Sequence, residues 1–162
     1  MNMRGSVSRR QILRAAGAVG VLGALGVPGT ALAADVRNEQ RVYIGVSLHP
    51  AGPTTNVGSF AMSGRFEDSG VSTAQASISP INSKQSRLSG EQQFAGQKGT
   101  IFTRFEGVSF PNNDPHAVGK GRFTIVSGTG AYAGVEGQGS FLIVVDFTSN
   151  QLIGTEVGTV EN

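Results

Sequence analysis

The chain has 162 residues, enough for one domain, and no cysteine, which excludes disulfide bonds, thiolate metal sites and thiol nucleophiles. Four of its 13 lysine and arginine residues, but none of its 11 acidic residues, lie within residues 1–33, so the rest of the chain has a small net negative charge and offers no basic surface for nucleic acid. His49 and His116 are too few for a metal site made of histidines alone, although a mixed site with carboxylates stays possible. We expect no metal and no cofactor.

The N-terminal segment has the features of a twin-arginine signal peptide. Arg9 and Arg10 are followed by apolar residues and a further base, and then by a weakly apolar run over 15–27. Small residues before the junction of Ala33 and Ala34 fit the cleavage pattern of signal peptidase. The alternative is a membrane anchor, but the run is shorter than the roughly 20 residues that span a bilayer. We therefore expect the twin-arginine machinery and signal peptidase as partners, no stable membrane anchor, and a secreted protein, extracellular or periplasmic.

The remaining segment, 34–162, is expected to form one all-β domain. It is rich in glycine, serine, threonine and β-branched or aromatic residues, and several stretches alternate between apolar and polar residues with a period of two. No stretch keeps the apolar stripe of a helix. We expect eight strands, at 41–48, 58–67, 71–78, 87–94, 100–110, 121–126, 139–147 and 152–160.

The breaks between these strands carry turn residues. Prolines interrupt the chain at 50–53 and 111–115, and polar residues predict turns at 68–70, as a hairpin, and at 148–150. Eight short strands in a meander have exposed edges unless the sheet closes. We therefore expect a single eight-stranded antiparallel barrel, whose interior either fills with side chains or holds one small ligand.

A glycine-rich segment between two apolar runs is the most distinctive part of the chain, which reads FTIVSGTGAYAGVEGQGSFLIVVDF from Phe123 to Phe147. Its spacing differs from that of a nucleotide-binding loop, because Ala133 stands where the third glycine would be. We expect Tyr132 to pack over the corner between two strands, or else to line a ligand site. The corner itself is expected to depend on its glycines, Gly128, Gly130, Gly134, Gly137 and Gly139.

This segment resembles the signature of the allene oxide cyclase and dirigent barrel superfamily: a strand, Gly-Thr/Ser-Gly, an aromatic residue two positions on, and further glycines that open the next long strand. The resemblance implies an antiparallel eight-stranded barrel with an apolar cavity, usually dimeric or trimeric. It also implies activities such as cyclisation of an unsaturated epoxide, steering of phenoxy-radical coupling, or polyketide ring closure. The acidic and asparagine residues that allene oxide cyclases carry near the start of the domain have no counterpart here, so Glu39 receives no role.

Few polar residues interrupt the expected strands, and three of them are candidate catalytic residues. Asp146 follows five apolar residues and is either a strand-end residue in water or a functional acid with a raised pKa. Arg104 and Glu106 share one face of their strand and form either a solvated pair outside the barrel or a polar pair inside it. Our hypothesis places Asp146 or the Arg104–Glu106 pair in a cavity, with Tyr132 near its rim.

Two functions follow from this pattern. The first is a barrel that binds a small apolar or unsaturated ligand and steers its cyclisation or coupling by positioning, as an isomerase-like enzyme without metal or nucleotide cofactor if it is catalytic. The alternative is a non-catalytic secreted or envelope interaction barrel with a filled interior. The volume of the interior discriminates between the two.

Overall fold

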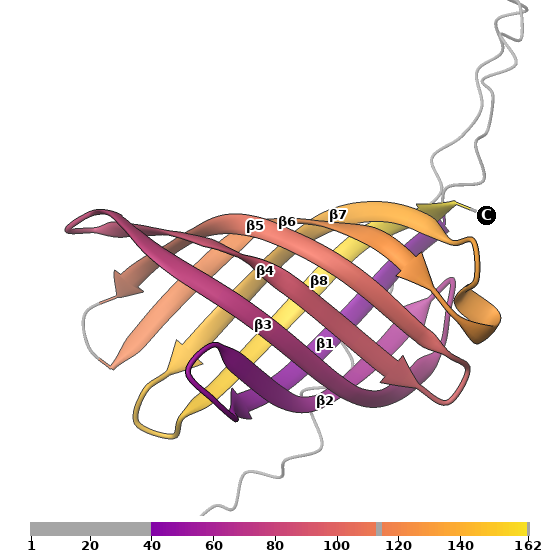
Figure 1. Ribbon diagram of the computed structural model, residues 1–162, viewed down its shortest axis with the longest axis horizontal. Helices are drawn as coiled ribbons and strands as arrows, with labels where there is room; N and C mark the ends of the chain where they lie inside the picture. The colour runs from indigo at the N-terminus through magenta and orange to yellow at the C-terminus, as the bar shows by residue number, and fades with distance from the viewer. Residues whose placement is uncertain (1–39, 113–114, 162) are drawn as a thin grey trace, which may run out of the picture. The chain divides into compact units, whose positions relative to one another are not determined.

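The computed structural model describes residues 40–112 and 115–161 (Figure 1). The expected signal peptide and its cleavage site lie outside these residues. The described chain forms eight strands and one short helix in sequence order. They are β1 (Gln40–Pro50), β2 (Thr55–Gly64), β3 (Asp68–Asn82), β4 (Gln85–Gly96), β5 (Thr100–Asn112), β6 (His116–Gly128), η1 (Gly130–Tyr132), β7 (Glu136–Asp146) and β8 (Gln151–Glu161).

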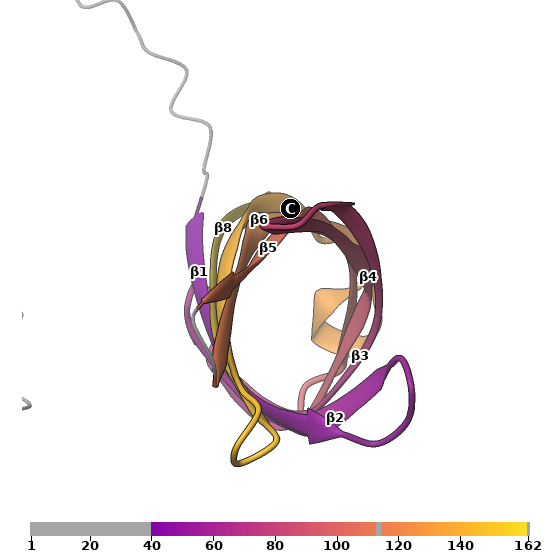
Figure 2. The ribbon, with the colours of Figure 1, turned by 90° about the vertical axis from the view of Figure 1, so that its left-hand side faces the viewer.

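The strands close into a barrel. Each strand pairs antiparallel with the next one along the chain, and β8 pairs antiparallel with β1, so that no edge is left open. Figure 2, which looks along the barrel, shows the strands as a continuous ring. The predicted all-β, eight-stranded antiparallel barrel is therefore confirmed.

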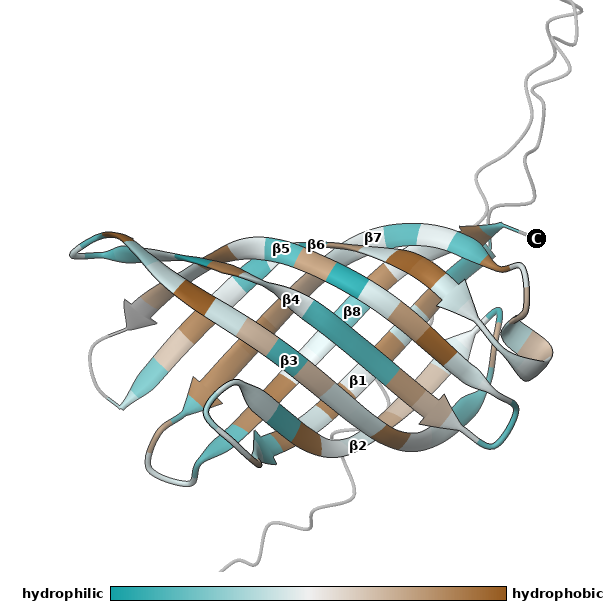
Figure 3. Cartoon of the chain, in the orientation of Figure 1, coloured by the Kyte–Doolittle hydropathy of each residue, from teal (hydrophilic) through white to brown (hydrophobic). Residues whose placement is uncertain are grey.

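Alternation along each strand separates the two faces of the wall (Figure 3). In β1, Val42, Ile44, Val46 and Leu48 point inward and are buried, whereas their neighbours are mostly exposed. The other strands contribute inward residues in the same way, because side chains in a strand alternate between faces. The core that results contains mainly Val, Ile and Phe side chains.

Two predicted turns differ from the structure. The segment 68–70 is not the hairpin turn: β2 ends at Gly64, which takes a φ of 99°, and β3 already begins at Asp68, so the turn lies at 65–67. The Asp68 carboxylate accepts hydrogen bonds from the backbone N–H groups of Gln97 and Lys98, which ties it to the neighbouring β4–β5 turn instead of to a turn of its own. The proline loop at 111–115 is also shorter than predicted, because the β5–β6 ladder continues to the pair Asn112–His116.

The helix η1 is a single 3-10 turn within the connection between β6 and β7. It lies at the end of the barrel where β6 ends and β7 begins, opposite the end that faces the viewer in Figure 2. Within residues 40–112 and 115–161, no helix is long and apolar enough to cross a membrane.

Candidate functional site

One end of the barrel is closed by the glycine-rich connection. Tyr132 of η1 points into this end and is only 1% exposed. Its ring packs edge-to-face against Phe66, with 5.2 Å between the ring centroids, and its hydroxyl donates a hydrogen bond of 2.7 Å to Asp68 Oδ2. Tyr132 therefore packs over the corner, and it is not among the residues that line the cavity described below.

The positions of this corner require glycine for different structural reasons. Gly130 and Gly134 take φ values of 61° and 77°, in the left-handed region that side chains with a Cβ rarely adopt. A Cβ at Gly128 would lie 2.1 Å from the backbone oxygen of Tyr132, so close approach of two backbones excludes a side chain there. Gly137 and Gly139 lie within β7, where a Cβ would meet the backbone of β8.

The other half of the barrel contains a cavity of about 510 Å³. It opens between the connections from β1 to β2 and from β7 to β8, at the end that faces the viewer in Figure 2. Its walls are mostly apolar, and they include Val46, Leu48, Leu88, Phe105, Phe141 and Ile143. The interior is thus filled at one end and hollow at the other.

The size of the inward residues explains this difference. Bulky residues such as Phe60, Phe94 and Phe123 fill the closed end. Around the cavity, the strands contribute small inward residues instead, among them Ala74, Ala76, Ala117 and Gly119. Because a protein interior collapses only partly around missing side-chain volume, small residues on several neighbouring strands leave a space that a ligand can occupy.

Among the described polar residues that line the cavity, Glu156 is the most buried. It comes from β8, lines the cavity and is only 5% exposed. Its partners in register are Phe141 on β7 and Ile44 on β1, both of which are buried. Its Oε2 atom is buried and has no hydrogen-bond partner in the part of the chain that the structure describes.

Burial determines the protonation state of Glu156. Desolvation raises its pKa from 4.5 to about 8, because a carboxylate loses its hydration in an apolar environment. At neutral pH the group is therefore mainly a neutral carboxylic acid. A neutral acid carries one O–H donor, in contrast to a carboxylate, which only accepts hydrogen bonds.

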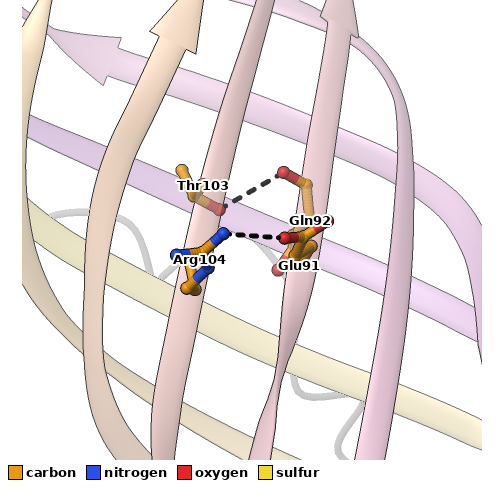
Figure 4. Close-up of polar contacts among 4 residues, drawn as sticks. All are labelled: Glu91, Gln92, Thr103 and Arg104. Carbon is orange, nitrogen blue, oxygen red and sulfur yellow. Dashed lines mark hydrogen bonds and ion pairs between the residues drawn. The ribbon is translucent and has the colours of Figure 1, made fainter.

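A second polar side chain at the cavity is already engaged. The Gln92 side chain lines the cavity and donates a hydrogen bond of 2.9 Å from Nε2 to Ser72 Oγ, which is completely buried. The Gln92 backbone oxygen accepts a hydrogen bond of 3.4 Å from the Thr103 hydroxyl, between β4 and β5 (Figure 4). This network holds the wall between β3, β4 and β5 together, whereas Oε2 of Glu156 has no hydrogen-bond partner among the described residues.

Arg104 and Glu106 do not form a polar pair inside the barrel. In β5 the odd-numbered residues Ile101, Thr103 and Phe105 face inward, so Arg104 and Glu106 face outward. Arg104 instead forms an ion pair of 3.1 Å with Glu91 on β4, and both side chains are 69% exposed (Figure 4). The hypothesis that this pair supplies the polarity of the cavity is therefore wrong, and the reason is the register of β5.

Asp146 lies at the rim of the cavity and serves the β7–β8 turn. Its Oδ1 accepts a hydrogen bond of 2.8 Å from the backbone N–H of Thr148, and its Oδ2 accepts one of 2.9 Å from the Ser149 hydroxyl. The backbone hydrogen bond from Thr148, the Ser149 hydroxyl and the nearby His116 lower the pKa of Asp146. Asp146 is thus a strand-end carboxylate whose oxygens bind groups of the turn. It is not the functional acid with a raised pKa that was the other alternative.

Sequence reasoning missed Glu156, although a signal was present. Residues 152, 154, 156, 158 and 160 share the inward face of β8 and read Leu, Gly, Glu, Gly and Val. On this face Gly154 and Gly158, two residues before and after Glu156, leave room for the glutamate side chain, and apolar residues stand at both ends. The outward face also carries apolar residues, Ile153 and Val157, so alternation alone did not indicate which face was buried.

Comparison of the chain with protein-family models and with curated proteins finds no match. The resemblance of the glycine-rich segment to the allene oxide cyclase and dirigent superfamily therefore stays a prediction. Within residues 40–112 and 115–161, no three histidine, aspartate or glutamate side chains come together as a metal site.

Proposed function

We propose that this protein binds a small apolar or unsaturated molecule in the open half of its barrel. The observation that carries the proposal is the cavity of about 510 Å³, which is lined mainly by apolar side chains and contains one deeply buried carboxyl group. Concave apolar sites with few polar groups are typical of small-molecule binding. The volume supports this function over the interaction barrel with a filled interior.

The proposal extends to catalysis by positioning. A rigid apolar wall that holds a flexible unsaturated ligand in one conformer favours one ring closure or coupling over the others, and it needs few reactive side chains. Among the described residues that line the cavity, Glu156 supplies the buried ionisable group that such a reaction would use. Membership of the allene oxide cyclase and dirigent superfamily is part of the same proposal, and the closed eight-stranded barrel supports it.

We place this barrel outside the cytoplasm, exported by the twin-arginine pathway. The support is the sequence around Arg9 and Arg10 and the small residues before Ala34. The apolar outer side chains Leu142 and Val144 of β7, with Ile153 and Val157 of β8, support the further proposal of a homo-oligomer, dimeric or trimeric.

The test of ligand binding uses N-phenylnaphthylamine, an uncharged dye whose emission increases in apolar surroundings. We expect saturable binding to the mature protein and its loss in Ala76→Leu, because Ala76 lines the cavity and a larger side chain fills it. Ala61→Leu is the matched control, since Ala61 is exposed on β2. Absence of saturable binding, or equal binding by both variants, would overturn the proposed function.

A further inference from the structure

Burial of the Glu156 carboxyl group in the barrel wall costs free energy of folding. Burying a polar group without a hydrogen bond costs free energy, and Oε2 of Glu156 has no partner among the described residues. The two neighbours in register, Ile44 and Phe141, offer no polar side chain. Glu156 lines the cavity, so a ligand bound there can supply a further hydrogen-bond partner for its carboxyl group.

The surroundings of Glu156 keep it uncharged. The cavity lining contains no lysine, arginine or histidine among the residues that the structure describes, and its other ionisable side chain is Asp146 at the rim. No positive charge therefore offsets the cost of ionising Glu156. The protonated form is favoured, in agreement with the pKa that burial raises to about 8.

We infer that Glu156 determines the specificity of the cavity by donating a hydrogen bond, as a neutral carboxylic acid, to a carbonyl or ether oxygen of an uncharged apolar ligand. This inference rests on the proposed function and names its ligand class. The ligand is apolar over most of its surface, to match the walls, and has one acceptor oxygen at the depth of Glu156. A neutral acid has the donor that such an oxygen needs.

Charged ligands fit this cavity less well. A ligand whose own carboxylate reached Glu156 would have no basic side chain to pair with among the described lining residues. An ammonium ligand would require Glu156 to ionise, and both charges would then lose their hydration in an apolar site. The Coulombic gain of a buried ion pair often fails to repay that cost when further hydrogen bonds are missing, and the Gln92 amide already donates to Ser72.

Three compounds of nearly the same shape separate these possibilities. Benzophenone has a carbonyl oxygen, diphenylmethane lacks it, and diphenylmethylamine replaces it with an ammonium group. Each is measured by displacement of N-phenylnaphthylamine from the mature protein. We expect benzophenone to bind about tenfold more tightly than diphenylmethane, the factor that one hydrogen bond of ordinary net strength provides.

Variants at position 156 identify the donor. Glu156→Gln keeps an N–H donor and should keep the preference for benzophenone, whereas Glu156→Leu should abolish it. Glu106→Gln, an exposed glutamate outside the barrel, is the matched control and should behave as the unmodified protein does. The carbonyl stretch of bound benzophenone should lie at lower frequency in the unmodified protein and in Glu156→Gln than in Glu156→Leu.

The pH dependence gives an independent readout. As pH rises through about 8, Glu156 loses its proton, so the affinity of the unmodified protein for benzophenone should fall. The affinity of Glu156→Gln should stay constant, because an amide does not titrate in this range. The affinity for diphenylmethane should change less than that for benzophenone, because it forms no hydrogen bond.

The outcomes distinguish this inference from the proposed function. If the dye itself does not bind, the proposed function fails and the inference fails with it. If the dye binds but benzophenone and diphenylmethane compete equally in the unmodified protein and in Glu156→Leu, only the inference is overturned. If diphenylmethylamine binds most tightly and Glu156→Gln removes that affinity, Glu156 acts as a carboxylate counter-ion and the inference is likewise overturned.

Discussion

The Tyr132 hydroxyl donates a hydrogen bond of 2.7 Å to Asp68 Oδ2 and thereby joins two residues that lie 64 positions apart in the chain. The same carboxylate accepts hydrogen bonds from the backbone N–H groups of Ser69, Gln97 and Lys98. Desolvation acts to raise the pKa of Asp68, but the hydrogen bonds from Tyr132 and the three backbone groups lower it below 3.8 overall. One acidic side chain thus holds η1 and the turn from β4 to β5 against the start of β3.

The first prediction concerns this contact. Tyr132→Phe should lower the free energy of unfolding by about 1 kcal/mol at neutral pH, less than the roughly 1.5–3 kcal/mol of a hydrogen bond to a charged group, because solvent screens the exposed side of Asp68. The pKa of Asp68 is lowered by folding, so this stabilisation is present above 3.8 and is lost as pH falls through the folded pKa. Urea unfolding at neutral pH and below 3.8 measures both effects.

Tyr43→Phe is the control for this prediction, because Tyr43 is the other tyrosine and is 42% exposed on the outside of β1. It should change the stability little at either pH. A loss of stability in Tyr132→Phe that is the same at both pH values would show that the hydroxyl does not act through the charged form of Asp68.

The second prediction concerns the glycine corner. Gly134→Ala should cost about 1–2 kcal/mol through backbone strain alone, since Gly134 has a φ of 77° and open space where a Cβ would lie. Gly134→Asn should cost less, because asparagine enters the left-handed region more readily. Gly128→Ala should cost more than either, because its Cβ would lie 2.1 Å from a backbone oxygen. Thermal unfolding of the three variants gives the order, and a reversed order would refute these separate reasons.

The third prediction concerns the outward ion pair. Arg104→Ala should lower the stability by less than about 1 kcal/mol, and added salt should reduce the difference, because the pair with Glu91 is exposed. It should leave the binding of N-phenylnaphthylamine unchanged. Glu91→Ala should have the same effects as Arg104→Ala. A large loss of dye binding in Arg104→Ala, but not in Glu91→Ala, would contradict this prediction and indicate that Arg104 contributes to the binding site.

The fourth prediction concerns export. Replacing Arg9 and Arg10 by lysine should keep the precursor in the cytoplasm, because the twin-arginine pathway reads the arginine pair. Arg4→Lys, outside the pair, should be exported normally and serves as the control. N-terminal sequencing of the exported protein should begin at or within a few residues of Ala34. An exported protein that still carries Met1 would contradict the proposed cleavage.

The barrel was predictable from the sequence, whereas the buried face of several strands was not. Alternation and turn residues located all eight strands and implied closure. In β7, however, Phe141 and Ile143 on one face and Leu142 and Val144 on the other are all apolar. Only pairing with both neighbours decides which set faces the interior.

The prediction of the candidate site likewise required knowing which face of each strand is buried. The mid-strand position of Arg104 allows it to face either side of the wall, and its place in β5 puts it outside the barrel. Glu156 lines the cavity because the pairing of β8 with both β1 and β7 turns this position inward, in register with Ile44 and Phe141. The hydrogen bond between Asp68 and Tyr132 is equally non-local, and a local turn signal at 68–70 gave no hint of it.

The fifth prediction concerns Glu156 in the absence of ligand. Its pKa is 4.5 in the unfolded chain and about 8 in the folded barrel, so the unfolded state releases its proton first as pH rises. The folded state should therefore lose stability between these values, on the order of 1 kcal/mol for each pH unit, with no further loss above the folded pKa. The wild-type dependence on pH is thus the first part of this prediction, and Glu156→Gln and Glu156→Leu should both remove it.

Glu156→Leu should in addition be more stable than the unmodified protein at alkaline pH, because it removes a buried polar group that lacks a partner. Urea unfolding from pH 5 to pH 9 measures the difference between each variant and the unmodified protein. A difference that stays constant over this range would show that Glu156 is ionised and solvated in the folded barrel, and the neutral hydrogen-bond donor would then be absent.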